Sequence, residues 1–191
     1  KETRETIHSS GLWHKTVHCW LYDELGYVYF QMRSEAPYQD KLYTTASGHV
    51  QSGETIHDAF VRETKEELGI DIADIPLEQL SIVRWQNHTP TKDDKVFCNL
   101  CIGKVNTLLP NFDFDENEVL GVVKLSAQSC LQLMQGNIEQ IPGIKITNKE
   151  IIPVSVTKDD FLLANDSEIS LIKYGSVLQA IVNKAITTWR A

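Results

Sequence analysis

Three glutamates in one short charged stretch are the residues of this sequence best suited to do chemistry. Glu63, Glu66 and Glu67 lie in the segment 55–68, whose apolar spacing predicts an α-helix. At about 100° per residue, their side chains fall within an arc of roughly 100° on one helix face. Carboxylates this close repel one another, and hard oxygen ligands on a rigid helix suit Mg²⁺ or Mn²⁺. The pattern predicts a divalent metal site, which in turn can bridge a diphosphate.

The alternative interpretation is a solvated acidic face, because charge runs on helices usually are one. Two neighbouring features favour the metal site. A loop that contains Gly48 leads directly into the helix. Arg62 lies one turn from Glu66 and within folding reach of Glu54.

The elements that position these residues follow from hydrophobic periodicity and turn residues. Aromatic and β-branched residues predict a hairpin of two strands around Gly26, and Gly69 ends the central helix, for which Thr55 and Asp58 form a capping box. The predicted strands are 13–23, 27–33, short pieces within 42–50, 80–85, 96–105 and 118–125; the helices are 55–68, 127–135 and 166–189; the polar loops and linkers are 34–41, 86–95 and 136–153. Alternating strands and helices predict a mixed α/β fold.

Composition narrows the class of protein. The chain has 191 residues and a formal net charge of −8, which argues against binding a nucleic-acid polymer through its phosphates. We find no apolar run of about 18 residues and no apolar signal-peptide stretch, so neither a membrane span nor secretion is predicted. The four cysteines are too few for a disulfide framework and fit a reducing, cytoplasmic location. Cys98 and Cys101 have CxxC spacing, but a strand would place them on opposite faces, so we expect core cysteines.

The stretch from Gly48 to Ile70 resembles the Nudix box, G-x5-E-x7-R-E-U-x-E-E-x-G-U, where U is a bulky apolar residue. Every fixed position matches, and the one departure is Thr64 at the first U position. The resemblance implies a single Nudix domain over 1–191: an α/β/α sandwich with a mixed sheet and a core of about 11–135, a polar linker of about 136–153 and an extra C-terminal helix of about 166–189. That helix would pack on the sandwich or at a homodimer interface.

The resemblance also implies roles for individual residues. Glu63, Glu66 and Glu67 would bind Mg²⁺ or Mn²⁺ together with the backbone carbonyl of Gly48. A salt bridge between Glu54 and Arg62 would hold the loop against the helix. The reaction would be attack of a metal-activated water on a diphosphate, which needs a carboxylate as general base. Candidates for that base are Glu66, Glu67 and the acidic run Asp113, Asp115, Glu116 and Glu118. Within this run, we assign Glu118 as a catalytic residue.

A second resemblance concerns the segments 13–21 and 46–49, which are similar to the isopentenyl-diphosphate-isomerase-like branch of Nudix proteins. In isomerases these histidine positions help hold a metal, and a cysteine stands two residues before the second histidine. Here that position is Ser47, and Lys95 is expected where an acidic metal ligand would stand. We predict His14 and His49 as substrate-binding residues, and a packed or hydrogen-bonded role for His18.

The sequence therefore predicts a metal-dependent pyrophosphohydrolase that acts on a nucleoside diphosphate derivative or another small organic diphosphate. An isopentenyl-diphosphate delta-isomerase is the first alternative, and Ser47 and Lys95 argue against it because the isomerase needs a strong acid at carbon. A non-catalytic Nudix-fold ligand sensor is the second. A sensor would be expected to lack box carboxylates, and all of them are present.

Overall fold

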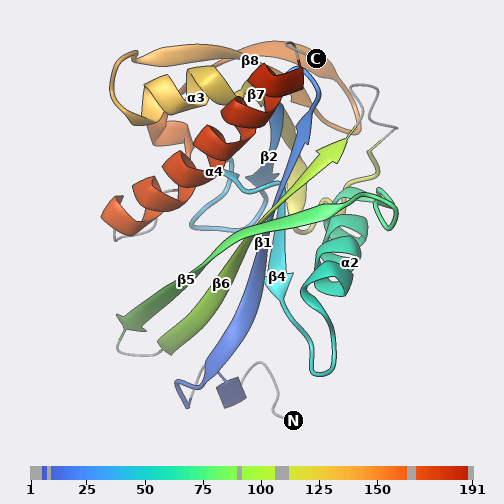
Figure 1. Cartoon of the computed structure of the whole chain (residues 1–191), viewed down its shortest axis with the longest axis vertical. Helices are drawn as coiled ribbons and strands as arrows, with labels where there is room; N and C mark the ends of the chain where they lie inside the picture. Colours follow the sequence, from blue (N-terminus) through green and yellow to red (C-terminus); the bar gives the residue numbers. More distant parts are fainter. Residues whose placement is uncertain (1–5, 8–9, 90–91, 106–111, 163–166, 189–191) are drawn as a thin grey trace.

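The structure is a computed structural model that describes residues 6–7, 10–89, 92–105, 112–162 and 167–188. Its elements are arranged around one large, twisted mixed sheet (Figure 1). The strands are β1 (Trp13–Asp23), β2 (Tyr27–Arg33), β3 (Leu42–Tyr43), β4 (Ala46–His49), β5 (Leu77–Thr89), β6 (Lys92–Val105), β7 (Val119–Ser126), β8 (Gln140–Ile146) and β9 (Ile151–Thr157). The helices are α2 (Ile56–Leu68), α3 (Ala127–Met134), α4 (Ser167–Thr188) and the 3₁₀ helix η1 (Lys158–Asp160).

The strand order along the sheet is β5-β6-β1-β2-β7-β8-β9. β1 and β6 run parallel along the whole of β1, whereas the other neighbouring pairs are antiparallel. β4 pairs with the first half of β1, and β3 pairs with the end of β2. This arrangement brings the loop before α2 and the end of β2 to the same part of the sheet.

Helices cover both faces of the sheet, which confirms the predicted sandwich. On one face, Ala59, Phe60 and Leu68 of α2 share a buried cluster with Val17 and Leu21 of β1. On the opposite face, α3 and α4 pack over a second cluster that is built around aromatic residues. Its members include Trp20, Phe30, Phe161 and Tyr174, together with Val177, Leu178 and Ile181 from α4. The C-terminal helix therefore packs on the sandwich, as one of the two predicted arrangements had it.

Local sequence explains the ends of α2. The Thr55 side chain accepts a hydrogen bond from the Asp58 N–H, and the Asp58 carboxylate accepts one from the Thr55 N–H, so the predicted capping box is formed. At the other end, Gly69 has φ 71°, a left-handed conformation that favours glycine. A Cβ there would also meet the backbone of Asp113. The helix that carries the glutamates thus has both ends set by its own neighbours.

The predicted polar loop 86–95 is wrong. β5 and β6 continue through this region as one long antiparallel hairpin, with Trp85 opposite Val96 and Gln86 opposite Lys95. The hairpin extends beyond the helices toward the lower end of the molecule in Figure 1. Polar residues are compatible with an antiparallel pair whose faces are not covered, so low hydrophobicity did not indicate a loop here.

The predicted polar linker 136–153 is also wrong, because β8 and the start of β9 lie in it. The backbone of β8 pairs with β7 on one side and with β9 on the other. Pro142 lies opposite Ser155, and Pro153 lies opposite Ile144. At the turn of this hairpin, the Thr147 N–H donates to the Glu150 carbonyl. Hydrogen-bonded and non-hydrogen-bonded residue pairs alternate from there along an antiparallel hairpin. Both prolines fall in non-hydrogen-bonded pairs, where the pairing of β8 with β9 needs no N–H.

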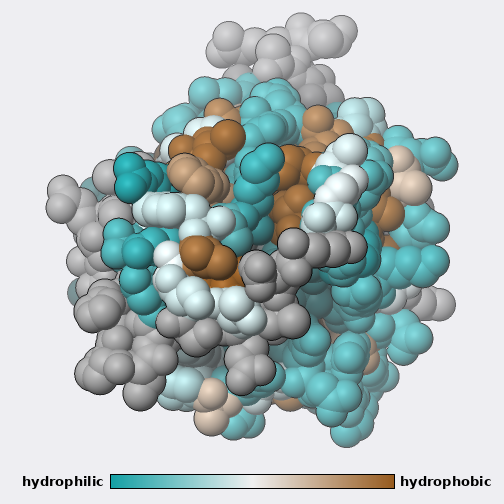
Figure 2. All heavy atoms as spheres, turned by 90° about the horizontal axis from the view of Figure 1, so that it is seen from below, coloured by the Kyte–Doolittle hydropathy of each residue, from teal (hydrophilic) through white to brown (hydrophobic). Residues whose placement is uncertain are grey.

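The first predicted hairpin, the helix α3 and the strand β7 are confirmed within a residue or two. Asp166, the predicted cap of the last helix, lies outside the described residues. Within the described part of the chain, no helix is long and apolar enough to cross a membrane. Viewed from below, the surface is largely hydrophilic with scattered apolar patches (Figure 2).

Candidate active site

The end of β4 lies directly against α2 at Gly48. A Cβ at Gly48 would overlap the carboxylate of Glu63. A larger residue would therefore displace this carboxylate from its position. The backbone of Gly48 and the Glu63 side chain are placed together, as the metal assignment requires.

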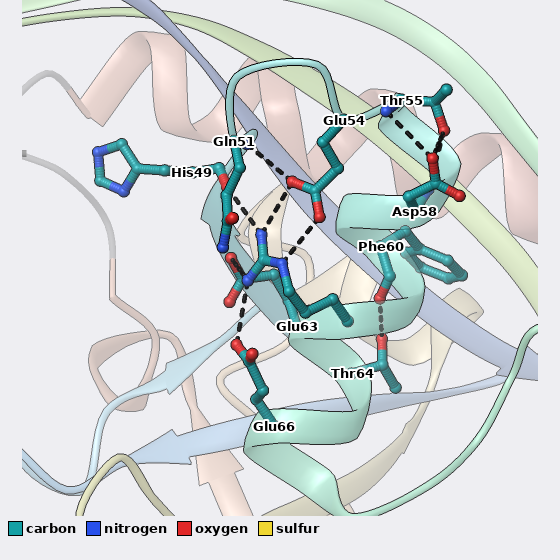
Figure 3. A network of polar contacts seen from close by, with 10 residues as sticks. His49, Gln51, Glu54, Thr55, Asp58, Phe60, Glu63, Thr64 and Glu66 are labelled. Atoms are coloured by element: carbon teal, nitrogen blue, oxygen red, sulfur yellow. Dashed lines mark hydrogen bonds and ion pairs between the residues drawn. The ribbon is translucent and has the colours of Figure 1, made fainter. Parts of the chain in front are cut away.

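Arg62 connects the loop and the helix through four partners (Figure 3). Its guanidinium binds both carboxylate oxygens of Glu54, with Nε to Oε1 at 2.8 Å and Nη2 to Oε2 at 3.1 Å. Nη2 also donates to the His49 carbonyl at 2.9 Å, while Nη1 donates to Glu63 at 2.8 Å and to Glu66 at 3.0 Å. The structure thus contains the Glu54–Arg62 bridge that the sequence predicted.

The same network sets the charge state of Glu54. Its hydrogen bonds from Arg62, and a further one from the Gln51 N–H, lower the pKa of the Glu54 carboxyl. The bidentate geometry is the arrangement in which a guanidinium binds a carboxylate most strongly. The Arg62 side chain therefore acts as a clamp, hereafter the Arg62 clamp, and its positive charge is paired with the negative charge of Glu54.

The three glutamates of α2 lie in different environments, although the helix brings them to one side. The Glu66 side chain is 59% exposed, Glu63 is half-buried, and Glu67 is 2% exposed. Burial raises the pKa of Glu63 despite its bond to Arg62. Burial, and then the neighbouring charge of Glu63, raises the pKa of Glu67 to about 8. Burial thus disfavours the charged form of both carboxylates, although Glu63 is bonded to Arg62.

Two hydrogen bonds hold Glu67, and both go to the same oxygen. The Ser47 N–H donates to Oε2 at 3.1 Å, and the Gln31 side-chain Nε2 donates to the same atom at 3.1 Å. Gln31 is fully buried on β2. The sequence analysis missed Gln31, although a glutamine within a strand of otherwise apolar and aromatic residues was a signal.

Arg33, two residues further along β2, is a second residue that the sequence analysis missed. Its positive charge acts on Glu67 and lowers a pKa that burial and Glu63 raise. Its Nε atom is buried and has no hydrogen-bond partner among the described residues. An arginine with a donor that no protein group uses can bind an anionic ligand at an acidic site.

In the acidic run after α2, the Asp115 N–H donates to the Glu67 carbonyl. The charge of Glu118 contributes to the raised pKa values of both Glu63 and Glu67. The residue is exposed, and its carbonyl accepts a hydrogen bond from the Ser34 N–H next to Arg33. Asp115 instead binds Asn117, and Glu116 binds Asn148. Asp113 is fixed by its backbone at the end of α2.

His14 and His49 come together next to this site. Their rings stack with centroids 4.7 Å apart, and His14 Nε2 lies 3.6 Å from the Asp94 carboxylate. The carbonyl of His49 belongs to the Arg62 clamp. The sequence analysis missed Asp94, because it placed this residue in a loop.

We expected Lys95 to stand where an isomerase has an acidic metal ligand, and this expectation is wrong. Successive residues of a strand point to opposite faces, so Lys95 and Asp94 point apart. Lys95 forms an ion pair with Asp93 at 2.8 Å, and Asp94, an acid, stands beside His14. The repulsion of a cation at His14 by Lys95 is therefore no argument against an isomerase, and Ser47 remains the departure from that pattern.

The remaining candidates have structural roles, as expected. His18 packs edge-on against Tyr43, whose hydroxyl lies 3.2 Å from its Nε2. Cys98 and Cys101 are both buried, one in each core cluster. Thr64, the departure from the box, is fully buried and donates to the Phe60 carbonyl, so a hydroxyl is accommodated at that position.

Within the described ranges, no three His, Cys, Asp or Glu side chains are arranged as a ready-made metal cluster. The chemistry of the donors nevertheless fits a hard divalent cation. Glu63 and Glu67 offer carboxylate oxygens, the charge of Glu63 raises the pKa of Glu67, and the close approach at Gly48 leaves its backbone next to Glu63. A divalent cation would offset the cost of burying the negative charges of Glu63 and Glu67.

Comparison with known proteins identifies the family. A model of the NUDIX domain matches residues 12–139, which is most of the chain and includes all the box residues. The chain belongs to the Nudix hydrolase family. It is also 30% identical over 175 residues to an uncharacterized Nudix hydrolase of Clostridium acetobutylicum, covering 85% of this chain and 83% of that one.

A more limited similarity links this Nudix chain to an isomerase. It is 29% identical over 105 residues to the isopentenyl-diphosphate delta-isomerase of Mycolicibacterium vanbaalenii, covering 52% of this chain and 58% of the relative.

Solved structures support the Nudix fold. A MutT/nudix family protein of Enterococcus faecalis superposes with a TM-score of 0.53 at 18% identity, covering 92% of this chain and 67% of that one. The C. elegans Ap4A hydrolase superposes with 0.51 at 16% identity, covering 87% and 98%.

Proposed function

We propose that this Nudix protein is a Mg²⁺- or Mn²⁺-dependent pyrophosphohydrolase of a nucleoside diphosphate derivative or another small organic diphosphate. The observation that carries the proposal is a pair of carboxylates on α2: Glu63, which lies against Gly48, and the buried Glu67, which is bonded to the Ser47 N–H. The Arg62 clamp lies beside this pair and keeps the loop and the helix together. The Ap4A hydrolase with the same fold is a protein whose name places its substrate in this chemical class.

The residues divide the work between binding the cation and binding the substrate. Glu63, Glu66 and Glu67, with the carbonyl of Gly48, would hold the cation. When bound, it would neutralise charge on the phosphoryl oxygens and make a neighbouring water more acidic. Arg33, whose Nε has no protein partner among the described residues, would bind a phosphate oxygen.

Glu118 is the general base in this proposal. It is exposed, so it can exchange protons with solvent, and it lies close enough to Glu63 and Glu67 to affect their pKa values. A base must reach the attacking water beside the metal ligands. The stacked rings of His14 and His49 would contact the organic part of the substrate at the mouth of the site.

A prenyl-diphosphate isomerase is the second candidate, and the proximity of His14, His49 and Asp94 favours it. Ser47 argues against it, because moving a double bond requires protonation of carbon, and a neutral hydroxyl is a much weaker acid than a thiol. We therefore expect no useful conversion of isopentenyl diphosphate. A sensor without catalysis would need no such complete set of carboxylates.

The test is to incubate the protein with a panel of nucleoside diphosphate derivatives and small organic diphosphates. Phosphate and nucleotide release is measured with Mg²⁺, with Mn²⁺ and after EDTA treatment. Formation of dimethylallyl diphosphate from isopentenyl diphosphate is followed in parallel. Metal-dependent release that Glu67→Gln abolishes supports the hydrolase. Enzyme-dependent isomerisation without hydrolysis would replace it with the isomerase, and tight binding without turnover would replace it with the sensor.

A further inference from the structure

Gln31 is a buried polar residue whose position is unfavourable unless it serves Glu67. It is 0% exposed and lies on β2, far in sequence from the box. Its Nε2 donates to Glu67 Oε2 at 3.1 Å. Its Oε1 is buried without a hydrogen-bond partner among the described residues. A buried acceptor that lacks a partner costs stability, so an apolar side chain of the same shape would serve the fold better.

The contacts of Glu67 show what the amide accomplishes. Gln31 and the Ser47 N–H both donate to Oε2, so this oxygen is fixed from two directions. Oε1 takes no hydrogen bond from the described residues and is the atom left for a ligand. Fixing one oxygen of a carboxylate orients the other, which lowers the cost of ordering the side chain when it binds a cation.

An amide matters at this position because it carries no charge. Arg62 binds Glu63 and Glu66 with a full positive charge, which competes with any cation for those carboxylates. Gln31 is neutral, so it orients Glu67 and leaves the full negative charge available. The two donors that contact Glu67 are an amide side chain and a backbone N–H, and neither carries a charge.

We propose that Gln31 is a positioning residue that holds Glu67 for metal binding without neutralising it. The inference rests on the proposed metal-dependent function, and it assigns a role to a residue outside the Nudix box. It predicts that an apolar replacement weakens metal binding while leaving the fold intact. It also predicts that a cationic replacement takes the place of the metal.

The test uses Gln31→Leu and Gln31→Lys in the full chain, with Mn²⁺ alone as the probe. Binding is measured by electron paramagnetic resonance, which requires no turnover. For Gln31→Leu we expect the Mn²⁺ dissociation constant to rise about 10-fold or more, with an unchanged or higher melting temperature of the metal-free protein. At saturating metal, KM for the diphosphate should stay within about two-fold of wild type. Gln31→Lys should bind Mn²⁺ more weakly still.

The matched control is Asn99→Leu, a buried amide on β6 that donates to the carbonyls of Thr16 and Phe97. It should lower the melting temperature and leave Mn²⁺ affinity unchanged. Gln31→Met, which keeps the length of the side chain, replaces Gln31→Leu if that variant does not fold. Mn²⁺ affinity within two-fold of wild type in a folded apolar variant would overturn the inference.

The outcomes also separate this inference from the proposed function. A wild-type protein that binds Mn²⁺ but hydrolyses no diphosphate would end the hydrolase proposal, while the Gln31 variants would still test the positioning role. A wild-type protein that binds no Mn²⁺ would overturn both. Hydrolysis with normal metal affinity in Gln31→Leu would overturn the positioning role alone.

Discussion

The outer and the inner side of the carboxylate cluster are held in opposite ways. On the outer side, the Arg62 clamp binds Glu54, Glu63 and Glu66 through charged hydrogen bonds, partly in contact with solvent. On the inner side, Glu67 is buried and receives hydrogen bonds only from neutral groups among the described residues. The pKa of Glu54 is lowered and that of Glu67 is raised. The outer side therefore holds the structure together, and on the inner side a cation would stabilise the ionised form of Glu67.

Glu67→Gln should have the largest effect, because it removes the negative charge from the inner side. We expect kcat to fall by about 100-fold or more and the Mg²⁺ concentration for half-maximal activity to rise. The metal-free protein should be as stable as wild type or more stable, since burying a neutral amide costs less than burying a carboxylate. Kinetics across a Mg²⁺ series, together with thermal melts in EDTA, measure both effects. Near-wild-type turnover at low Mg²⁺ would refute the metal assignment.

Arg62→Ala should affect stability and rate together, because it breaks the outer side. The loss of the bidentate bond to Glu54 and of the bond to the His49 carbonyl should lower the free energy of unfolding by about 1–3 kcal/mol. The rate should fall because the end of β4, which carries Gly48, and the loop after it are no longer held against α2. Arg62→Lys keeps the charge but not the fork, and should recover only part of both losses. Denaturant unfolding and kcat measure them, and a variant unchanged in both would show that the clamp has no organising role.

Arg33→Ala should produce an intermediate effect confined to substrate binding. Because its Nε has no protein partner among the described residues, its removal should change the melting temperature little. KM for the diphosphate should rise about 10-fold, which corresponds to about 1.4 kcal/mol. Arg84→Ala is the control, since that guanidinium stacks on Trp13 at 4.3 Å on exposed strands. Equal KM values for the two variants would remove Arg33 from the substrate site.

The smallest expected effect is a pH dependence of the metal-free protein. Glu67 has a higher pKa in the folded state than in the unfolded chain, so the folded state binds more protons between about pH 4.5 and 8. Stability should therefore be greatest at the acid end of this window and decline as the pH rises through it. Glu54, whose pKa is lowered, acts in the opposite sense at lower pH.

Thermal melts at pH 5, 6, 7 and 8 in EDTA measure this decline. Glu67→Gln should flatten the curve, because the group that titrates is gone. Mg²⁺ should raise the melting temperature most at pH 8, where the carboxylate is ionised. A wild-type curve that rises between pH 5 and 8 would contradict the buried state of Glu67.

The sequence by itself determined the contiguous part of the site. Residues three and four apart on a helix share a face, so the spacing within 55–68 was sufficient to place the glutamates together, whereas the bridge between Glu54 and Arg62 was implied by the resemblance to the Nudix box. The cap at Thr55 and the end at Gly69 likewise depend on neighbours in sequence. The first hairpin and both later helices followed from periodicity for the same reason.

The tertiary structure decided which groups meet from distant segments. No local pattern shows that Gln31 donates to Glu67, or that Asp94 faces His14 while Lys95 points away, because strand pairing and register set these contacts. The strands within 86–95 and 136–153 escaped prediction since their polar residues and prolines are tolerated only in a particular pairing. Glu66 and Glu67 are adjacent in sequence but differ in solvent exposure. The difference arises because the sheet buries one side of the helix and leaves the other in solvent.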